Sequence, residues 1–362
     1  MEQLKTEAVI FIPGFYAGPR NKYLDDYLLL GLTTRLENRQ VEVGGEEVKI
    51  QGHSGKRVIY DAPDEQNKTI DIYEVYWNDL INPLSAKSVK DQAFRGFFLF
   101  GYWLFSGIWR MSRKSRTLFL QFLLFMLLHV LWYYGTLIVI LTTLGQNPSS
   151  FGLQVPAEWT PKLAEIGKSL GGWQIWIITS FILSLLPMPI SSIVDLTDFT
   201  TRYLQDETQA GIGAVRDKIR QRVEKTLNDV IKQDEYERVT VLAHSFSVII
   251  AIDLLADYQP RTKKPIRFIS MGGAVEVLSY LSEWVIEEST KCLNNEAVLY
   301  WHDYYSDQDW LCTKTPVREN DQSSKFFSRK IRLRVPLAQQ ITGDSHNAYF
   351  FEKALLEDLL DG

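Results

Sequence analysis

The sequence contains few cysteines and few histidines, which limits the chemistry that it can carry. Its two cysteines, Cys292 and Cys312, are too few for a disulfide framework and lack the close spacing of a zinc or redox pair. This favours a reduced, intracellular setting. The five histidines are scattered, and no two have the helical spacing that paired metal ligands would need. We therefore expect no metal site.

The sequence also lacks an excess of positive charge. It has 39 Lys and Arg against 44 Asp and Glu, a net charge of −5, and its basic residues are spread along the chain. A nucleic-acid partner is therefore not expected. The N-terminal segment has acidic residues early and its apolar run begins only at Ala8, which is unlike a signal peptide. We expect any membrane attachment to come from inside the chain.

The first part of the chain is typical of an α/β domain. Residues 7–12 form a short apolar, β-branched run that a proline and a glycine close, which predicts a buried strand and a tight turn. Residues 21–37 are predicted to be helical. A glycine-rich polar stretch at 41–60 predicts a hairpin, and residues 70–77 predict a further strand of the same sheet.

Strands and helices alternate in the last part of the chain. Apolar residues at helical spacing predict a helix at 217–237. Strands are predicted at 238–245, 266–273 and 297–305 with helices between them, and a last strand at 329–337 precedes a C-terminal helix. Such alternation predicts an α/β fold, with a mostly parallel sheet flanked by helices.

A long uncharged run interrupts this pattern. Residues 117–144 are about 28 in number, more than the roughly 20 needed to cross a bilayer, and predict a transmembrane helix. A second uncharged run predicts a return helix at 171–194, although its two prolines leave a re-entrant or interfacial segment as the alternative. We expect a transmembrane hairpin, with residues 145–168 as its connecting loop.

The segment before the first span is aromatic and then basic. Residues 94–109 are too short to span and carry Arg95, so we interpret them as an interfacial helix, with a buried helix as the alternative. Four basic residues follow: Arg110, Arg113, Lys114 and Arg116. They predict that the flanking domain faces the cytoplasm, as at a bacterial inner membrane. The expected domains are 1–93 joined to 200–362, with 94–199 as a membrane insertion.

The strand at 238–245 runs directly into Ser245, and an apolar helix follows. A nucleophilic serine on a sharp strand-to-helix turn needs small residues two positions before and after it, and Ala243 and Ser247 meet this requirement. The usual pattern has glycine at both positions. Ser245 is therefore the candidate nucleophile, and the alternative is a serine that caps the helix from Val248.

A serine nucleophile needs a base within hydrogen-bond reach and an acid that orients the base. His346 lies in a polar loop between the last strand and the C-terminal helix, and it is preferred to His302, which lies within a predicted strand. For the acid, the turn that follows the strand favours Asp309. Asp307 remains an alternative, and Asp303 is still within the strand.

Acyl transfer also needs two N–H donors for the oxyanion. Phe246, the residue after the nucleophile, is expected to supply one of them. The other is expected from Phe15, after the turn formed by Pro13 and Gly14. A plain turn after an edge strand is the alternative.

These segments together resemble an α/β-hydrolase of the lipase and esterase group. The likeness rests on FIPGF, VLAHSFS, the SDQD turn and SHNAYF. It covers about residues 7–93 and 200–361, and it implies a Ser-His-Asp triad, acyl-enzyme chemistry and no cofactor. The sequence departs from the family pattern at Ala243 and Ser247, at Pro13 where the family often has histidine, and in its membrane insertion.

The leading hypothesis is a membrane-anchored serine hydrolase that cleaves a carboxylic ester or thioester of a lipid-like substrate. Its expected partners are that substrate and a membrane, and a second copy of the chain is a further candidate. One alternative is a membrane scaffold or effector that kept the fold and lost turnover. Another is a soluble esterase whose aromatic segments form a homodimer core.

Overall fold

The fold divides into two compact units along the chain. A computed structural model describes residues 6–16, 18–36, 39–62, 67–110, 116–152, 155–171, 190–209, 213–259, 262, 264–309, 312–317, 324–336, 339–340 and 344–361. The sheet unit comprises Met1–Leu80 and Asp206–Gly362, and the helical unit comprises Ile81–Gln205. The predicted insertion, 94–199, therefore lies within the helical unit.

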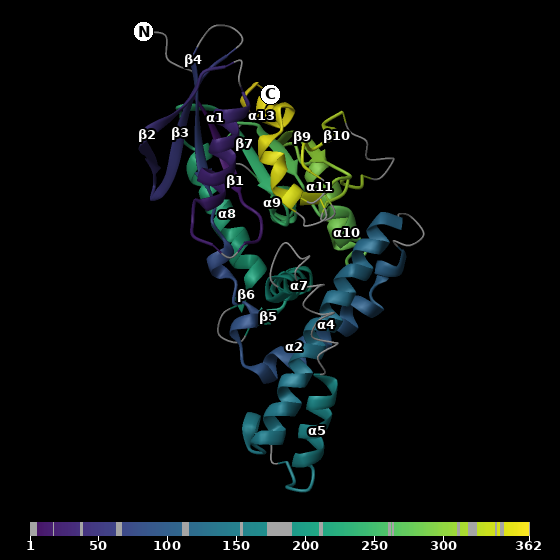
Figure 1. Cartoon of the computed structure of the whole chain (residues 1–362). Coiled ribbons are helices and arrows are strands. Elements are labelled where there is room, and N and C mark those ends of the chain that lie inside the picture. The colour runs from purple at the N-terminus through teal and green to yellow at the C-terminus, as the bar shows by residue number, and fades with distance from the viewer. Residues whose placement is uncertain are drawn as a thin grey trace. The chain divides into compact units, whose positions relative to one another are not determined.

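One mostly parallel sheet forms the centre of the sheet unit (Figure 1). In the described residues its eight strands follow the order β10-β9-β8-β7-β1-β4-β3-β2, and only β2 with β3 and β3 with β4 pair antiparallel. The strands are β1 (Thr6–Ile12), β2 (Val41–Ile50), β3 (His53–Asp61), β4 (Asn67–Glu74), β7 (Tyr236–His244), β8 (Ile266–Met271), β9 (Val298–Tyr305) and β10 (Phe326–Lys330). A short separate pair is formed by β5 (Thr208–Gln209) and β6 (Gly213–Ala214).

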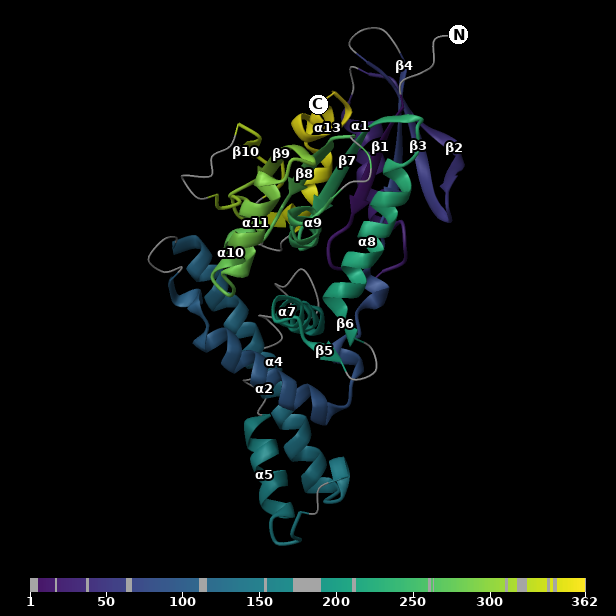
Figure 2. The same cartoon turned by 180° about the vertical axis from the view of Figure 1, so that it is seen from behind.

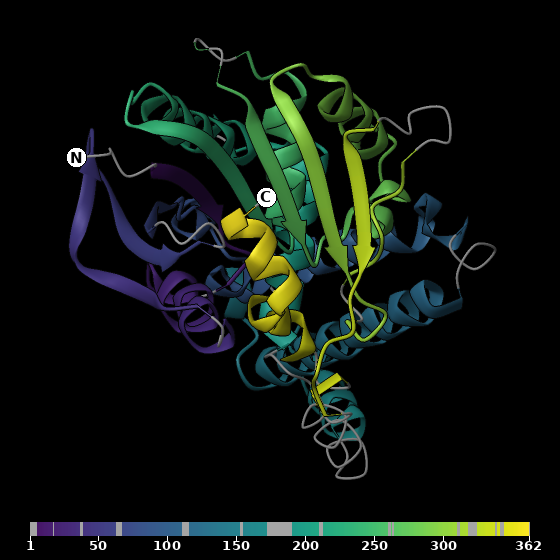
Figure 3. The same ribbon diagram turned by 90° about the horizontal axis from the view of Figure 1, so that it is seen from above.

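Helices cover both faces of this sheet (Figure 3). One layer contains η1 (Leu24–Leu29), α1 (Leu30–Arg35), η7 (Asp344–Phe351) and α13 (Lys353–Asp361), and the other contains α8 (Val215–Ile231), α9 (Ser247–Ala256), α10 (Val275–Ser279) and α11 (Trp284–Asn294). Side chains alternate along β1: Val9 and Phe11 belong to the core under α1 and α13. Ala8 and Ile10, also fully buried, point to the opposite face. Burial on both faces explains the continuous apolar run, and the predicted α/β class is confirmed.

The last strand was predicted in the wrong place. The prediction was 329–337, whereas β10 ends at Lys330 after pairing with β9. The ladder ends there because β9 itself ends at Tyr305, whose carbonyl accepts the N–H of Ile331 over 2.8 Å. Within the described part of the chain, residues 332–336 pair with no strand.

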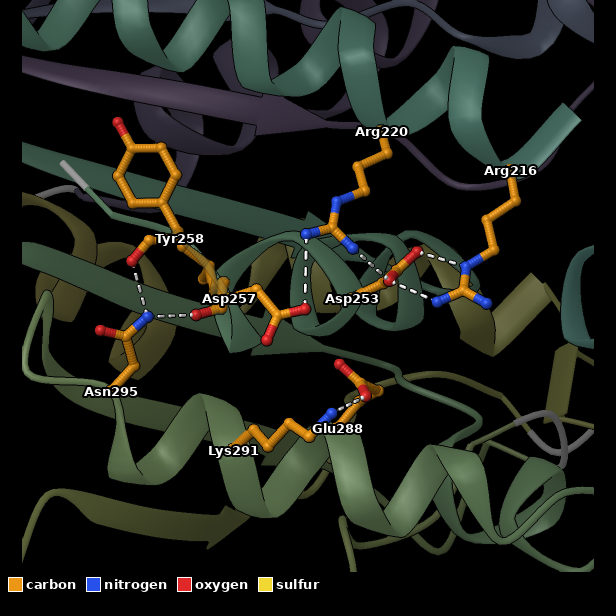
Figure 4. A network of polar contacts seen from close by, with 9 residues as sticks. Arg216, Arg220, Asp253, Asp257, Tyr258, Glu288, Lys291 and Asn295 are labelled. Carbon is orange, nitrogen blue, oxygen red and sulfur yellow. Dashed lines mark hydrogen bonds and ion pairs between the residues drawn. The ribbon is translucent and has the colours of Figure 1, made fainter. Parts of the chain in front are cut away.

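A buried charge network joins α8 to α9 (Figure 4). The fully buried carboxylate of Asp253 on α9 accepts two hydrogen bonds from Arg216, at 2.8 and 2.9 Å, and one from Arg220 at 3.2 Å. The guanidinium of Arg216 also lies 4.0 Å from the ring centroid of Trp284 on α11. The network therefore balances the one buried charge that α9 carries under α8.

The described part of the helical unit is built from helices alone. They are η3 (Leu84–Ala86), α2 (Val89–Phe105), η4 (Gly107–Arg110), α4 (Arg116–Gln146), η5 (Ser150–Gly152), α5 (Thr160–Leu170) and α7 (Ile190–Leu204). α2 is capped by Ser88, whose hydroxyl accepts the N–H of Asp91 over 3.2 Å. The unit begins before this helix because the N–H and hydroxyl of Ser85 both bond Asp195 of α7.

The connecting segment at 145–168 is not the loop that the sequence predicted. It contains α5, which packs against α4. A Cβ on Gly145 would lie 2.7 Å from Ala164, so the two backbones approach too closely for a larger residue. Gly167 makes the same close approach to Thr142, where a Cβ would lie 2.8 Å from the hydroxyl oxygen. The glycines look like loop residues in the sequence, yet they serve helix packing.

One helical segment in the described part of the chain is long and apolar enough to cross a membrane, Met126–Gln146 of α4. It falls within the predicted helix at 117–144 except at its last two residues. The predicted return helix at 171–194 falls mainly on 172–189, which lie outside the described residues. The described helix after that gap is α7, which starts at Ile190.

Candidate active site

Ser245 occupies a strained turn between β7 and α9. Its φ angle is +62°, in the left-handed region that residues other than glycine rarely adopt. Its N–H donates to the carbonyl of Met271 at the end of β8 over 3.0 Å, which fixes the turn against the neighbouring strand. Ser245 is partly exposed, whereas His244 and Phe246 on either side are buried. The turn thus presents one serine side chain at the carboxyl edge of the sheet.

Gly14 lies directly against this serine. A Cβ added to Gly14 would lie 2.9 Å from the Cβ of Ser245 and 3.4 Å from its hydroxyl oxygen. Glycine is therefore required by the close approach of the two chains. The segment after β1, from Pro13 to Phe15, forms one wall beside Ser245.

Trp77 and Ser247 hold that wall in place. The indole Nε1 of Trp77 donates to the carbonyl of Pro13 over 2.8 Å and to the hydroxyl of Ser247 over 2.9 Å. The hydroxyl of Ser247 in turn donates to the same carbonyl. Ser247 and Trp77 are fully buried. The serine that replaces the usual glycine therefore ties the start of α9 to the turn after β1.

Asn78 clamps the next residues of the wall. Its amide nitrogen donates to the carbonyl of Gly14 over 3.1 Å, and its amide oxygen accepts the N–H of Tyr16 over 3.0 Å. Both bonds flank Phe15 and hold its peptide on each side. The sequence reasoning missed Trp77 and Asn78. They come three and four residues after the end of β4, which is parallel to β1, so their position at the same sheet edge as Gly14 was a usable signal.

The two predicted oxyanion residues lie near one another. The rings of Phe15 and Phe246 pack against Trp77, with centroid separations of 6.5 and 6.4 Å. Phe246 follows Ser245 in sequence, and Phe15 follows the glycine that touches Ser245. The main chains of both predicted residues therefore flank the serine.

Among the three aspartates considered, Asp309 is the one that contacts His346. Its Oδ2 lies 2.7 Å from Nδ1 of His346, and its side chain is fully buried. Asp307 is exposed and pairs with Lys330. Asp303 is buried between strands, where it accepts hydrogen bonds from Ser270, Thr315 and Ser328 over 2.8, 3.0 and 3.1 Å.

His346 lies on η7, a 3₁₀ helix, rather than in the predicted loop. The turn after β8 makes room for its ring: a Cβ on Gly272 would lie 3.3 Å from Cε1 of His346. Gly272 has a φ angle of +63°, which favours glycine there, and the sequence reasoning did not single it out. Nε2 of His346 is buried and has no hydrogen-bond partner among the described residues. The hydrogen bond expected between Ser245 and this nitrogen is therefore not formed in the structure.

The alternative base, His302, lies elsewhere. Its Nδ1 pairs with the carboxylate of Asp358 on α13 over 2.8 Å, and the hydroxyl of Tyr304 donates to the same carboxylate over 2.9 Å. His302 thus links β9 to the C-terminal helix. In the described ranges, no group of three or more His, Cys, Asp or Glu side chains is arranged to hold a metal ion.

His244 supports the 3₁₀ helix η7, which carries His346. A carbonyl oxygen accepts only, so Nε2 of His244 carries the proton that it donates to the carbonyl of His346 over 2.9 Å. The ring centroids of His244 and His346 are 4.7 Å apart, and the rings of Tyr23 and Phe350 also pack against His244. Complete burial, with His346 adding to it, holds the pKa of His244 well below its usual range. His244 is therefore a neutral, buried support.

No protein-family model, curated protein or solved structure matches this chain. The chemistry of the site has to be argued from its own geometry. A carboxylate on Nδ1 holds a histidine in the tautomer whose Nε2 offers a lone pair, which is the form that accepts a proton. The site thus combines an oriented base and a serine on a strained turn, with two backbone segments beside the serine.

Proposed function

We propose that this chain is a membrane-anchored serine hydrolase of the α/β-hydrolase type, which cleaves a carboxylic ester or thioester of a lipid-like substrate. The observation that carries the proposal is the left-handed turn at Ser245, packed against Gly14 at the same sheet edge as the Asp309–His346 pair. A non-glycine residue in the left-handed region costs free energy of folding, and such residues cluster at functional sites. A strained serine at a strand-to-helix turn therefore points to a nucleophile.

In the proposed reaction, Oγ of Ser245 attacks the acyl carbon while Nε2 of His346 accepts the hydroxyl proton. The carboxylate of Asp309 stabilises the imidazolium through Nδ1. The N–H groups of Phe15 and Phe246 are proposed to bind the oxyanion. His346 then protonates the alkoxide or thiolate that leaves. Water, deprotonated by His346, next attacks the acyl carbon of the acyl-enzyme. As the bond to Oγ breaks, His346 returns that proton to Ser245, and the carboxylic acid product is released.

The proposal is tested by labelling with a fluorophosphonate probe, which forms a bond to an activated serine. The wild-type chain in detergent should be labelled and should hydrolyse a panel of acyl esters and thioesters. Ser245→Ala should lose both properties. Ser282→Ala, a partly buried serine outside the site, is the control and should keep them. Undiminished labelling of Ser245→Ala would contradict the assignment.

Two features of the helical unit support the membrane part of the proposal. α4 has 31 residues, about 46 Å at roughly 1.5 Å per residue, which exceeds the roughly 30 Å thickness of a hydrocarbon core. On α2, four phenylalanines at Phe94, Phe97, Phe98 and Phe105 are 45–85% exposed. The charge among them, Arg95, is paired with Asp198 over 2.5 Å. An exposed aromatic face with its charge turned inward suits an interfacial helix.

Membrane attachment is tested by extraction. Membranes washed with high salt or alkaline carbonate should retain the chain, and detergent should release it. Release by salt alone would contradict the anchor and favour a soluble esterase.

We further propose that the sheet unit faces the cytoplasm, because the basic residues precede the first span. Protease added to the periplasmic side should then leave the sheet unit intact.

A second candidate is a membrane scaffold that kept the fold and lost turnover. One observation favours it: Nε2 of His346 has no hydrogen-bond partner among the described residues, so Ser245 is not engaged. Catalytic hydrogen bonds often tighten only when substrate binds, which is why hydrolysis remains the leading proposal. Failure of the wild-type chain to react with any serine-directed probe would favour the scaffold.

A further inference from the structure

A groove of about 580 Å³ lies beside the carboxyl end of β4, in the sheet unit. Its volume is within the range of pockets that hold small ligands. Its lining does not include Ser245 or His346. The segment Glu74–Leu80 forms one wall, and residues 218–226 of α8, the helix labelled in Figure 2, form another.

The wall on α8 is polar and largely basic. Lys218, Gln221, Arg222 and Lys225 have the spacing i, i+3, i+4 and i+7, so that one face of the helix points at the groove. The opposite face is apolar and buried against the sheet. Arg20, on the segment after β1, adds a further cation from another side.

Most of these cations are not neutralised within the described residues. Arg222 bonds Asp79, and neither Arg20, Lys218 nor Lys225 forms an ion pair there. The carboxylates in the lining are those of Asp79 and Glu74. Four cations therefore face two acidic groups, and the groove attracts an anion.

Glu74 is the second sign of a ligand site. Its side chain is only 3% exposed; Oε2 accepts the N–H of Asn21 over 2.5 Å, whereas Oε1 is buried and has no hydrogen-bond partner among the described residues. Burial raises the pKa of Glu74 to about 7. The carboxyl group is thus protonated over part of the neutral range, and its unpartnered oxygen can then donate a hydrogen bond.

We propose that this groove binds the phosphate group of an acyl-lipid substrate, an inference that rests on the hydrolase function proposed above. A phosphate group offers several acceptor oxygens and one to two negative charges, which suit separate cations on α8 and after β1. The groove is connected to the wall beside Ser245 by the segment Tyr76–Asp79. Asn78, which bonds Gly14 and Tyr16, lies between the lining residues Tyr76 and Asp79. Occupation of the groove therefore positions the turn beside Ser245.

The test is calorimetric binding to the full-length Ser245→Ala protein in detergent, where nothing is turned over. The probes are dihexanoyl phosphatidic acid, dihexanoylglycerol and inorganic phosphate. The phosphatidic acid should bind, the neutral glyceride should bind at least about fivefold more weakly, and rising salt should reduce the difference. Equal binding of the two lipids would overturn the proposal.

Two variants locate the phosphate. Lys218→Ala with Lys225→Ala should weaken phosphatidic acid binding at least about fivefold and leave glyceride binding unchanged. Lys232→Ala, an exposed lysine at the end of α8 outside the groove, is the control for loss of charge and should bind as wild type. Glu74→Gln, neutral and able to donate, should bind at least as tightly as wild type. A fivefold loss in Glu74→Gln or in the control would contradict the assignment.

The remaining outcomes separate the sources of phosphate and the two proposals. If inorganic phosphate competes with the lipid at equal concentration, the groove binds free phosphate. The proposal that it binds the phosphate group of a lipid substrate is then overturned. Because binding is measured without catalysis, lysine-dependent binding in a chain that no serine probe labels would support the groove and contradict the hydrolase function alone.

Discussion

Nε2 of His244 donates to the main-chain carbonyl of His346 over 2.9 Å, and the two imidazole rings are 4.7 Å apart. The residue beside the candidate nucleophile thereby supports the candidate base. These two residues are 102 positions apart in sequence, so only the folded chain brings them together. The contact links the strained turn at Ser245 to η7.

Removing this donor should impair the site more than the fold. His244→Leu leaves a buried carbonyl unpaired, at about 1–3 kcal/mol, and should slow labelling of Ser245 on the order of 10²-fold. His244→Gln places an amide N–H near the same position and should recover most of the rate. Labelling kinetics and urea unfolding on both variants measure the two effects. Equal rates in Leu and Gln would show that the donor is irrelevant to positioning.

Substitution of the acid should distinguish Asp309 from Asp307. Asp309→Asn removes the carboxylate that holds Nδ1 of His346, and kcat should fall about 10²- to 10⁴-fold. Asp307→Asn breaks an exposed, solvent-screened ion pair with Lys330 and should leave kcat within about twofold of wild type. Ester hydrolysis by both variants gives the answer. A larger loss in Asp307→Asn would reverse the assignment.

A methyl group on Gly14 should disrupt the wall beside Ser245. Gly14→Ala puts Cβ 2.9 Å from Cβ of Ser245, so the turn has to shift. The free energy of unfolding should fall by about 1–3 kcal/mol, and Ser245 should lose its labelling by the serine probe. Gly45→Ala on β2 is the control, because nothing lies within 4 Å of its Cβ, and it should stay within about 0.5 kcal/mol. Full labelling of Gly14→Ala would refute the close approach.

Stability should depend on pH through Glu74. Burial raises its pKa from 4.5 to about 7, so the folded chain keeps a proton that the unfolded chain has released between these values. The stabilising contribution is present below pH 4.5 and is lost as pH rises through 7, by up to about 3 kcal/mol. Glu74→Gln should therefore be more stable than wild type at pH 8, relative to pH 5, in urea unfolding. Glu224→Gln, on the exposed side of α8, controls for loss of one charge; an identical profile in both variants would contradict the prediction.

Local patterns in the sequence were sufficient for most elements of the sheet unit. The hairpin predicted at 41–60 is β2 and β3, and the strand predicted at 238–245 is β7, which ends one residue before Ser245. Apolar alternation and turn residues act over a few positions, so they are visible in one sequence. Where the outcome depended on a distant partner the prediction was wrong, as for the strand at 329–337 and the loop at 145–168.

The sequence by itself determined that a serine between small residues follows a buried strand, and that candidate histidines and aspartates lie downstream of it in the chain. Tertiary structure alone decided which carboxylate reaches His346, because Asp307 and Asp309 are two residues apart and only the turn after β9 separates their directions. It also decided that Ser247 and Trp77 share the carbonyl of Pro13. Such bonds join residues 64 to 234 positions apart, and no local periodicity records them.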